Sequence, residues 1–127
     1  MSVPFKTIVL IAALIGAAPA FAQAMPLQTF LAKASALEKK GAMALFSGDL
    51  KRLKAEMQGS ATALRAERLA AAKAGKRPAY CPPEKGAPMN SDEVLTHFRS
   101  IPVAQRAQMT TRDAFRSLMI RRYPCPA

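Results

Sequence analysis

Apolar side chains recur at spacings of three and four residues in the segment 26–40, which reads PLQTFLAKASALEKK. Side chains with that spacing share one face of an α-helix. The positions concerned are Leu27, Phe30, Leu31, Ala34 and Leu37. Proline suits the first turn of a helix, where no backbone N–H is needed, and Pro26 stands at that point. The pattern therefore predicts an amphipathic helix over residues 26–40.

A second, longer apolar stripe runs through residues 50–74, after a short apolar patch around Leu45 and Phe46. Its members are Leu50, Leu53, Met57, Ala61 and Leu64. Asp49 precedes the stripe and is the expected N-cap, since its carboxylate can accept the free N–H groups of the first turn. We expect the two helices to form an antiparallel hairpin over residues 26–75. The same stripe also suits packing against a second copy of the chain, so a homodimer stays an alternative.

Four prolines interrupt residues 76–89, and this segment is expected to be an irregular connector. A third helix should open at Asn90, because Glu93 follows three positions later in the spacing of a capping box. It should end near Pro102, and the following VAQRAQM should form a turn.

The last helix is expected to start at Thr110, with Asp113 again three positions on. Its inward side chains should be Phe115, Leu118 and Met119. No stretch alternates apolar and polar residues as a strand would. The fold class predicted is therefore all-α, a small domain of about four helices.

The first 22 residues, MSVPFKTIVLIAALIGAAPAFA, have the three parts of a cleaved secretory signal. One positive charge (Lys6) precedes an apolar run, and small residues at Ala20 and Ala22 mark a cut after Ala22. The run is too short for a membrane anchor, which needs about 20 apolar residues. We expect export to the periplasm and a mature chain of residues 23–127 that forms one domain.

Two cysteines are present, Cys81 in AYCPP and Cys125 in YPCP. Cysteine pairs normally oxidise outside the cytoplasm. Each precedes a proline, which favours extended backbone and keeps both thiols off a helix. A redox pair would instead favour the spacing C-x-x-C, and a metal site would need more ligands than His97 supplies. We therefore expect a structural Cys81–Cys125 disulfide, with free thiols as the alternative, and no metal or cofactor.

The segment 80–125, YCPPEKGAPMNSDEVLTHFRSIPVAQRAQMTTRDAFRSLMIRRYPC, resembles the Rap/Tai family. The features that carry the resemblance are a C-x-P opening, a helix ending in an aromatic-x-x-x-Pro run, and a closing aromatic-Pro-Cys. Members of this family are periplasmic immunity proteins against amidase effectors of type VI secretion. The resemblance implies a helical, disulfide-braced domain that binds and blocks a peptidoglycan-cleaving amidase.

The charge offers a second indication of a partner. The chain has 19 Lys and Arg against 8 Asp and Glu, and without Lys6 the net charge falls from +11 to +10. Residues 33–77 hold most of the excess. Such a surface attracts acidic proteins, anionic lipids or cell-wall polymers, while an exported protein rarely meets nucleic acid. A solvated helix face that only keeps the protein soluble is the alternative.

No catalytic motif accompanies this charge. The chain has no nucleophile elbow, glycine-rich phosphate loop or HExxH pattern, and His97 is its single histidine. We therefore expect a binding protein and not an enzyme. Arginines are enriched at the centres of protein interfaces. The contact residues predicted on this basis are Arg65, Arg68, Arg112 and Arg116.

Overall fold

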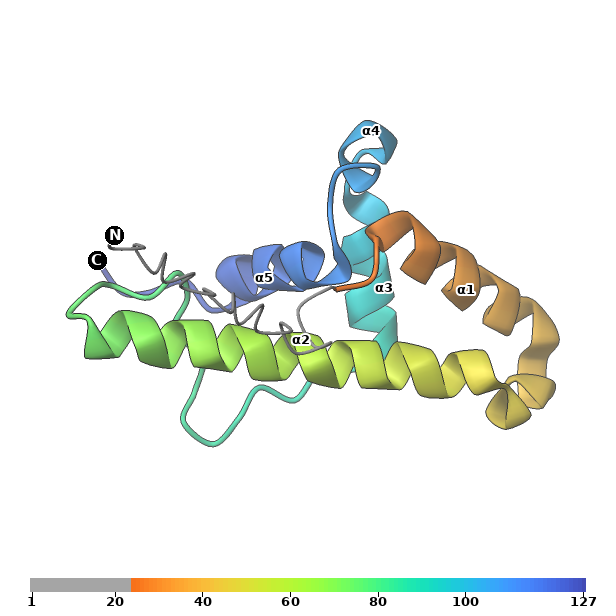
Figure 1. The fold of residues 1–127 in the computed structure, drawn as a ribbon, viewed down its shortest axis with the longest axis horizontal. Helices are drawn as coiled ribbons and strands as arrows, with labels where there is room; N and C mark the ends of the chain where they lie inside the picture. The colour runs from red at the N-terminus through yellow and green to blue at the C-terminus, as the bar shows by residue number, and fades with distance from the viewer. Residues whose placement is uncertain (1–23) are drawn as a thin grey trace, which may run out of the picture.

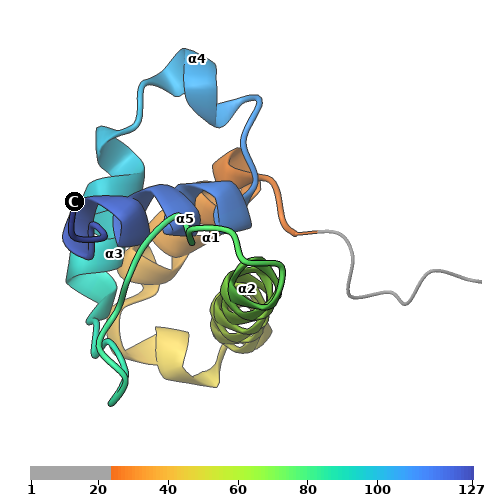
Figure 2. The ribbon, with the colours of Figure 1, turned by 90° about the vertical axis from the view of Figure 1, so that its left-hand side faces the viewer.

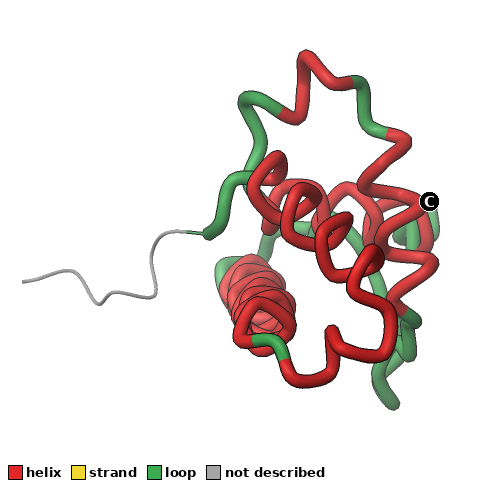
Figure 3. Tube along the Cα trace, turned by 90° about the vertical axis from the view of Figure 1, so that its right-hand side faces the viewer, coloured by secondary structure: helices red, strands yellow, loops and turns green. Residues whose placement is uncertain are grey.

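The protein is described by a computed structural model that covers residues 24–127 of the 127-residue chain. The signal predicted for residues 1–22 lies outside the described residues. Helices joined by loops make up the described part, with no strand in it (Figures 1 and 3). The elements are α1 (Leu27–Lys40), the 3-10 helix η2 (Gly41–Phe46), α2 (Gly48–Lys73), α3 (Ser91–Ser100), α4 (Val103–Arg106) and α5 (Thr111–Arg122). The all-α prediction is confirmed.

Helix α1 runs toward η2, where the chain turns and enters α2, the longest helix (Figure 1). Gly41 permits the turn because its φ of 56° lies in the left-handed region that other residues avoid. The expected N-cap of α2 was wrong by two positions. Ser47 caps the helix, and its hydroxyl accepts the N–H of Asp49 at 3.3 Å. Asp49 instead pairs with Lys33 of α1 at 3.0 Å.

The core lies where α1, α2, α3 and α5 meet, and Figure 2 shows α1, α3 and α5 grouped beside the end-on view of α2. The predicted face of α1 is buried in full, and Phe30 meets the ring of Phe98 edge-on with 5.5 Å between centroids. From α2, Leu53 and Leu64 are buried within the same chain. Of the other residues of the stripe that also suited a homodimer, Leu50 and Met57 are partly buried and Ala61 is exposed, so the stripe lies only in part in the interior of one protomer.

Helices α3 and α5 begin at the predicted positions, but the capping box expected at α3 is only half formed, because the Glu93 side chain pairs with Arg122. The Asn90 side chain accepts the N–H of Glu93 at 2.8 Å. At α5 the capping box is complete, since Thr110 Oγ1 accepts the N–H of Asp113 at 3.2 Å and the Asp113 carboxylate accepts the N–H of Thr110 at 3.0 Å. Burial opposes ionisation of Asp113, but the Thr110 bonds and Arg116 outweigh it and lower its pKa.

Between these helices, the expected turn contains a short helix, α4. The Arg106 side chain holds it in place by donating to the carbonyl of Ile101 at 2.7 Å.

The start of the described chain is joined to the loop before α5. The N–H of Leu27 donates to Met109 O at 3.0 Å, and the N–H of Thr111 donates to Met25 O at 2.8 Å. These bonds flank an isolated antiparallel bridge between Pro26 and Thr110. Segments more than eighty residues apart are thereby held side by side.

Candidate binding site

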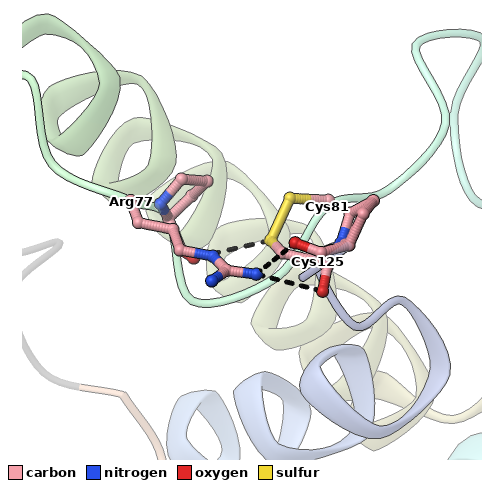
Figure 4. The surroundings of a disulfide bond; sticks show 5 residues. Arg77, Cys81 and Cys125 are labelled. Carbon is pink, nitrogen blue, oxygen red and sulfur yellow. Dashed lines mark hydrogen bonds between the residues drawn. A yellow bond between two sulfur atoms is a disulfide. The ribbon is translucent and has the colours of Figure 1, made fainter.

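The predicted disulfide is present. Cys81 in the connector and Cys125 at the chain end are bonded, with their Cα atoms 4.9 Å apart (Figure 4). Beside it the N–H of Cys81 donates to Tyr123 O at 2.8 Å. The Arg77 guanidinium donates to the carbonyls of Cys125 and Pro126 (Figure 4). A covalent bond and several hydrogen bonds thus fasten the last residues to the connector that follows α2.

The four predicted contact arginines lie on α2 and α5, but in different surroundings. Arg116 pairs with Glu67 of α2 at 2.8 Å and with Asp113 of its own helix at 2.9 Å. Arg68 lies over the ring of Tyr80, 5.3 Å from its centroid. Both are therefore already engaged in holding α2, α5 and the connector together.

The other two are freer. Arg65 is exposed, and Arg112 is half-buried. Arg112 Nε is buried and has no hydrogen-bond partner among residues 24–127. Only these two of the four present a guanidinium without a carboxylate partner or an aromatic ring against it in the described part.

Most of the basic residues have no carboxylate partner within the described chain. Residues 24–127 contain eighteen Lys and Arg, and four of them (Lys33, Arg99, Arg116 and Arg122) form the salt bridges of this segment. Fourteen cations remain without an acidic partner there. Five of the eight acidic residues are used in those same pairs, and the Glu56 carboxylate accepts the N–H of Met25 at 2.6 Å. Internal pairing thus uses most of the negative charge and leaves most of the positive charge unpaired within residues 24–127.

An apolar groove of about 500 Å³ lies between α1, α2, α3, α5 and the end of the connector. Its principal side chains are Phe30, Leu50, Met57, Met89, Leu95 and Phe115. At the rim, Glu38 is occupied by Arg99 at 2.9 Å, whereas Lys54 is exposed and has no acidic partner in the described part. Concave apolar surfaces with a few polar groups are the usual binding sites of proteins. The groove can therefore take an apolar group that carries negative charge beside it.

His97 makes a contact that the sequence did not predict. Its Nε2 lies 2.8 Å from Ser117 Oγ, twenty positions away on α5. The Ser117 hydroxyl donates to the carbonyl of Ala114 at 2.7 Å, so it accepts its bond from the imidazole. Burial, and then the charge of Arg121, lower the pKa of His97. In a catalytic Ser–His pair the serine hydroxyl donates to the histidine, and a third group orients the imidazole. Here Ser117 accepts the bond instead, and His97 Nδ1 has no hydrogen-bond partner among residues 24–127.

Residues 24–127 bring no three His, Cys, Asp or Glu together in an arrangement that could hold a metal ion. Within that same range, no helix has the length and apolar character required to cross a bilayer.

No protein-family model matches the chain, and comparisons with curated proteins and with solved structures find no significant match.

Proposed function

We propose that the mature chain is an exported, periplasmic binding protein without catalytic activity, and that its partner is an acidic protein. The observation that carries this proposal is the charge distribution: fourteen cations of the described chain lack an acidic partner within it, while most carboxylates are engaged internally. Complementary charge of this kind speeds association and selects among partners.

The apolar groove supports the same proposal. Binding energy at protein interfaces concentrates in a few apolar or aromatic anchors that enter pockets and are surrounded by polar groups. The groove supplies such a pocket, and Lys54 at its rim supplies a positive charge beside it. We therefore expect the partner to place an apolar side chain in the groove and a carboxylate near Lys54.

The resemblance of residues 80–125 to the Rap/Tai family names a class of partner. Immunity proteins of that family bind amidase effectors of type VI secretion. The proposed partner is accordingly a peptidoglycan amidase that reaches the periplasm, and the proposed consequence is inhibition of that amidase. An amidase gene next to the gene for this chain would favour this partner over an unrelated acidic protein.

The test is a pull-down from periplasm with the tagged mature chain after chemical crosslinking, together with an assay of amidase activity on peptidoglycan. Lys54→Glu and Arg65→Glu should each weaken capture at least tenfold. Lys85→Glu is the matched control, because it changes the net charge equally on the exposed connector, away from the groove lining. If Lys85→Glu weakens capture as much as Lys54→Glu and Arg65→Glu do, binding depends on the total charge and not on this surface. A periplasm with no captured protein removes the proposal.

A second candidate function is docking on the anionic cell envelope, either on lipid or on wall polymer. It is favoured by an exposed apolar element between basic residues at the α1–α2 junction. Binding of this kind should weaken steeply between about 0.05 and 0.5 M salt, since exposed charges are screened over a few ångströms at high ionic strength. Co-sedimentation with peptidoglycan sacculi and with lipid vesicles separates the two surfaces.

A further inference from the structure

The 3-10 helix η2 exposes three large apolar side chains at the point where α1 turns into α2. Met43 is 67% exposed, Leu45 75% and Phe46 85%. We call these three residues the apolar tip. Figure 3 views the molecule from the side on which η2 joins the two helices. The other large apolar residues that are exposed, Leu69, Val103 and Ile120, lie on three separate elements. Among residues 24–127, η2 is therefore the element that carries more than one large exposed apolar side chain.

The apolar tip is open to solvent, since each of its three side chains is at least 67% exposed. None of them lines the apolar groove described above. Soluble chains seldom leave several large apolar side chains uncovered on one element unless something binds there. An exposed apolar element of this kind fits a partner surface that can cover it.

Basic side chains flank the apolar tip on both sides. The exposed cations nearest to it in the chain are Lys39, Lys40, Lys51, Arg52 and Lys54. The two acidic residues in this stretch, Glu38 and Asp49, are neutralised by Arg99 and Lys33. Five exposed cations thus flank the three apolar side chains along the chain, and both carboxylates between residues 38 and 54 are paired.

We propose that the apolar tip inserts into the interface of an anionic lipid bilayer while the five flanking cations contact the head groups. Apolar insertion and a polybasic segment are the two signals that together hold a protein on a membrane surface, whereas either alone binds weakly. Lysine and arginine stems lie along apolar material while their charges reach the head groups. Of the two envelope surfaces considered above, this proposal selects the lipid, and it rests on the proposed export of the chain.

The absence of tryptophan from the whole sequence makes insertion directly measurable. In Phe46→Trp the new indole is the single strong fluorophore of the mature chain. With vesicles of phosphatidylglycerol and phosphatidylcholine its emission should shift to shorter wavelength, and with phosphatidylcholine alone it should not. Val103→Trp is the matched control, because Val103 is 66% exposed on α4 and lies outside the apolar tip. Its emission should stay that of an indole in water under both conditions.

A second set of variants measures the contribution to affinity. The triple variant Met43→Ser, Leu45→Ser, Phe46→Ser should reduce the partition coefficient onto anionic vesicles at least tenfold. The control Leu69→Ser, Val103→Ser removes exposed apolar side chains elsewhere and should change it less than twofold. All five positions are exposed, so both proteins should fold, which circular dichroism checks.

The outcomes distinguish this inference from the wider proposal. If the Phe46→Trp variant binds vesicles in a salt-sensitive way but its fluorescence emission does not shift, the protein docks by charge alone, and the proposed insertion is overturned. Binding to sacculi but not to vesicles, or a shift at Phe46→Trp produced by a soluble acidic protein and not by vesicles, would overturn it as well. No binding to any anionic surface would overturn both.

Discussion

The two ends of α2 are surrounded in opposite ways. At its C-terminal end, the connector and the chain terminus are tied by the Cys81–Cys125 disulfide and by the bonds of Arg77. At its N-terminal end, η2 holds the apolar tip in solvent between unpaired cations. The first region is held by covalent and polar contacts within the chain, whereas the second exposes three apolar side chains. The first end stabilises the fold, and the second is the end that we propose to meet a partner.

At the C-terminal end of α2, the disulfide is the main source of stability, because few apolar side chains are buried there. The core cluster beside it contains only three buried side chains, Leu64, Tyr80 and Met119, whereas the cluster under α1 contains eleven. A small core near a chain end frays unless something restrains it. The following experiments test this contrast, beginning with the largest effect.

Removing the disulfide should have the largest effect on stability. Cys81 and Cys125 are 44 positions apart, and closing a loop of that size stabilises a fold by about 4 kcal/mol in the chain-entropy model. Cys81→Ser combined with Cys125→Ser should lower the free energy of unfolding by about that amount, measured by urea denaturation. The reduced wild-type protein is the control and should unfold at the same urea concentration. A loss below about 1 kcal/mol would contradict the assigned role of the disulfide.

Substitutions of two phenylalanines, one in the core and one in the apolar tip, should affect stability very differently. Phe98 is fully buried against Phe30, and Phe46 is mostly exposed. Phe98→Ala should cost about 3–5 kcal/mol, because it removes a large side chain from the core. Phe46→Ala should change the free energy of unfolding by less than about 0.5 kcal/mol, as surface changes usually do. Equal losses in thermal or urea unfolding would show that the apolar tip supports the fold.

The capping box at α5 should contribute less. Thr110→Ala leaves the N–H of Asp113 without its acceptor and should cost about 1 kcal/mol of unfolding free energy. Thr96→Ala is the matched control, since Thr96 is exposed in the middle of α3 and caps nothing. Its unfolding free energy should change by less than about 0.5 kcal/mol. Identical values for the two variants would remove the stabilising role of the box.

The smallest effect should be a pH dependence that arises between α3 and α5. Burial lowers the pKa of His97 below its ordinary value near 6.5. The unfolded chain therefore binds a proton at a pH where the folded chain does not, and stability is lost as the pH falls through 6.5 toward the folded pKa. Above 6.5 the contribution is complete. His97→Gln should flatten this slope in urea titrations between pH 7.5 and 5. A slope that persists in the variant would place its origin in another group.

Local signals in the sequence predicted much of the fold. The spacing of Asn90 to Glu93 and of Thr110 to Asp113 located two helix starts, because capping depends on residues three positions apart. The disulfide was predicted from two cysteines that each precede a proline, together with the expectation of export. The position of Ser47 as N-cap was missed, since Asp49 is an equally good cap by type and its pairing with Lys33 appears only once α1 and α2 are in contact.

The candidate site was less predictable, because tertiary contacts define it. Arg116 was expected to contact a partner, yet Glu67, 49 positions earlier, neutralises it across the α2–α5 contact. The groove draws its lining from α1, α2, α3, α5 and the connector, and no single segment reveals it. The apolar patch at Leu45 and Phe46 was visible in the sequence, but its exposure was not, because apolar residues are usually buried. The basic residues on either side of the patch were the feature of the sequence that could have indicated its exposure.

The length of α2 determines how far apart these two ends act. Its 26 residues correspond to about 39 Å at 1.5 Å per residue. A ligand held at one end is thus separated by more than the width of a lipid bilayer's hydrocarbon layer from anything held at the other. The helix therefore works as a rigid spacer that keeps the apolar tip and the disulfide apart.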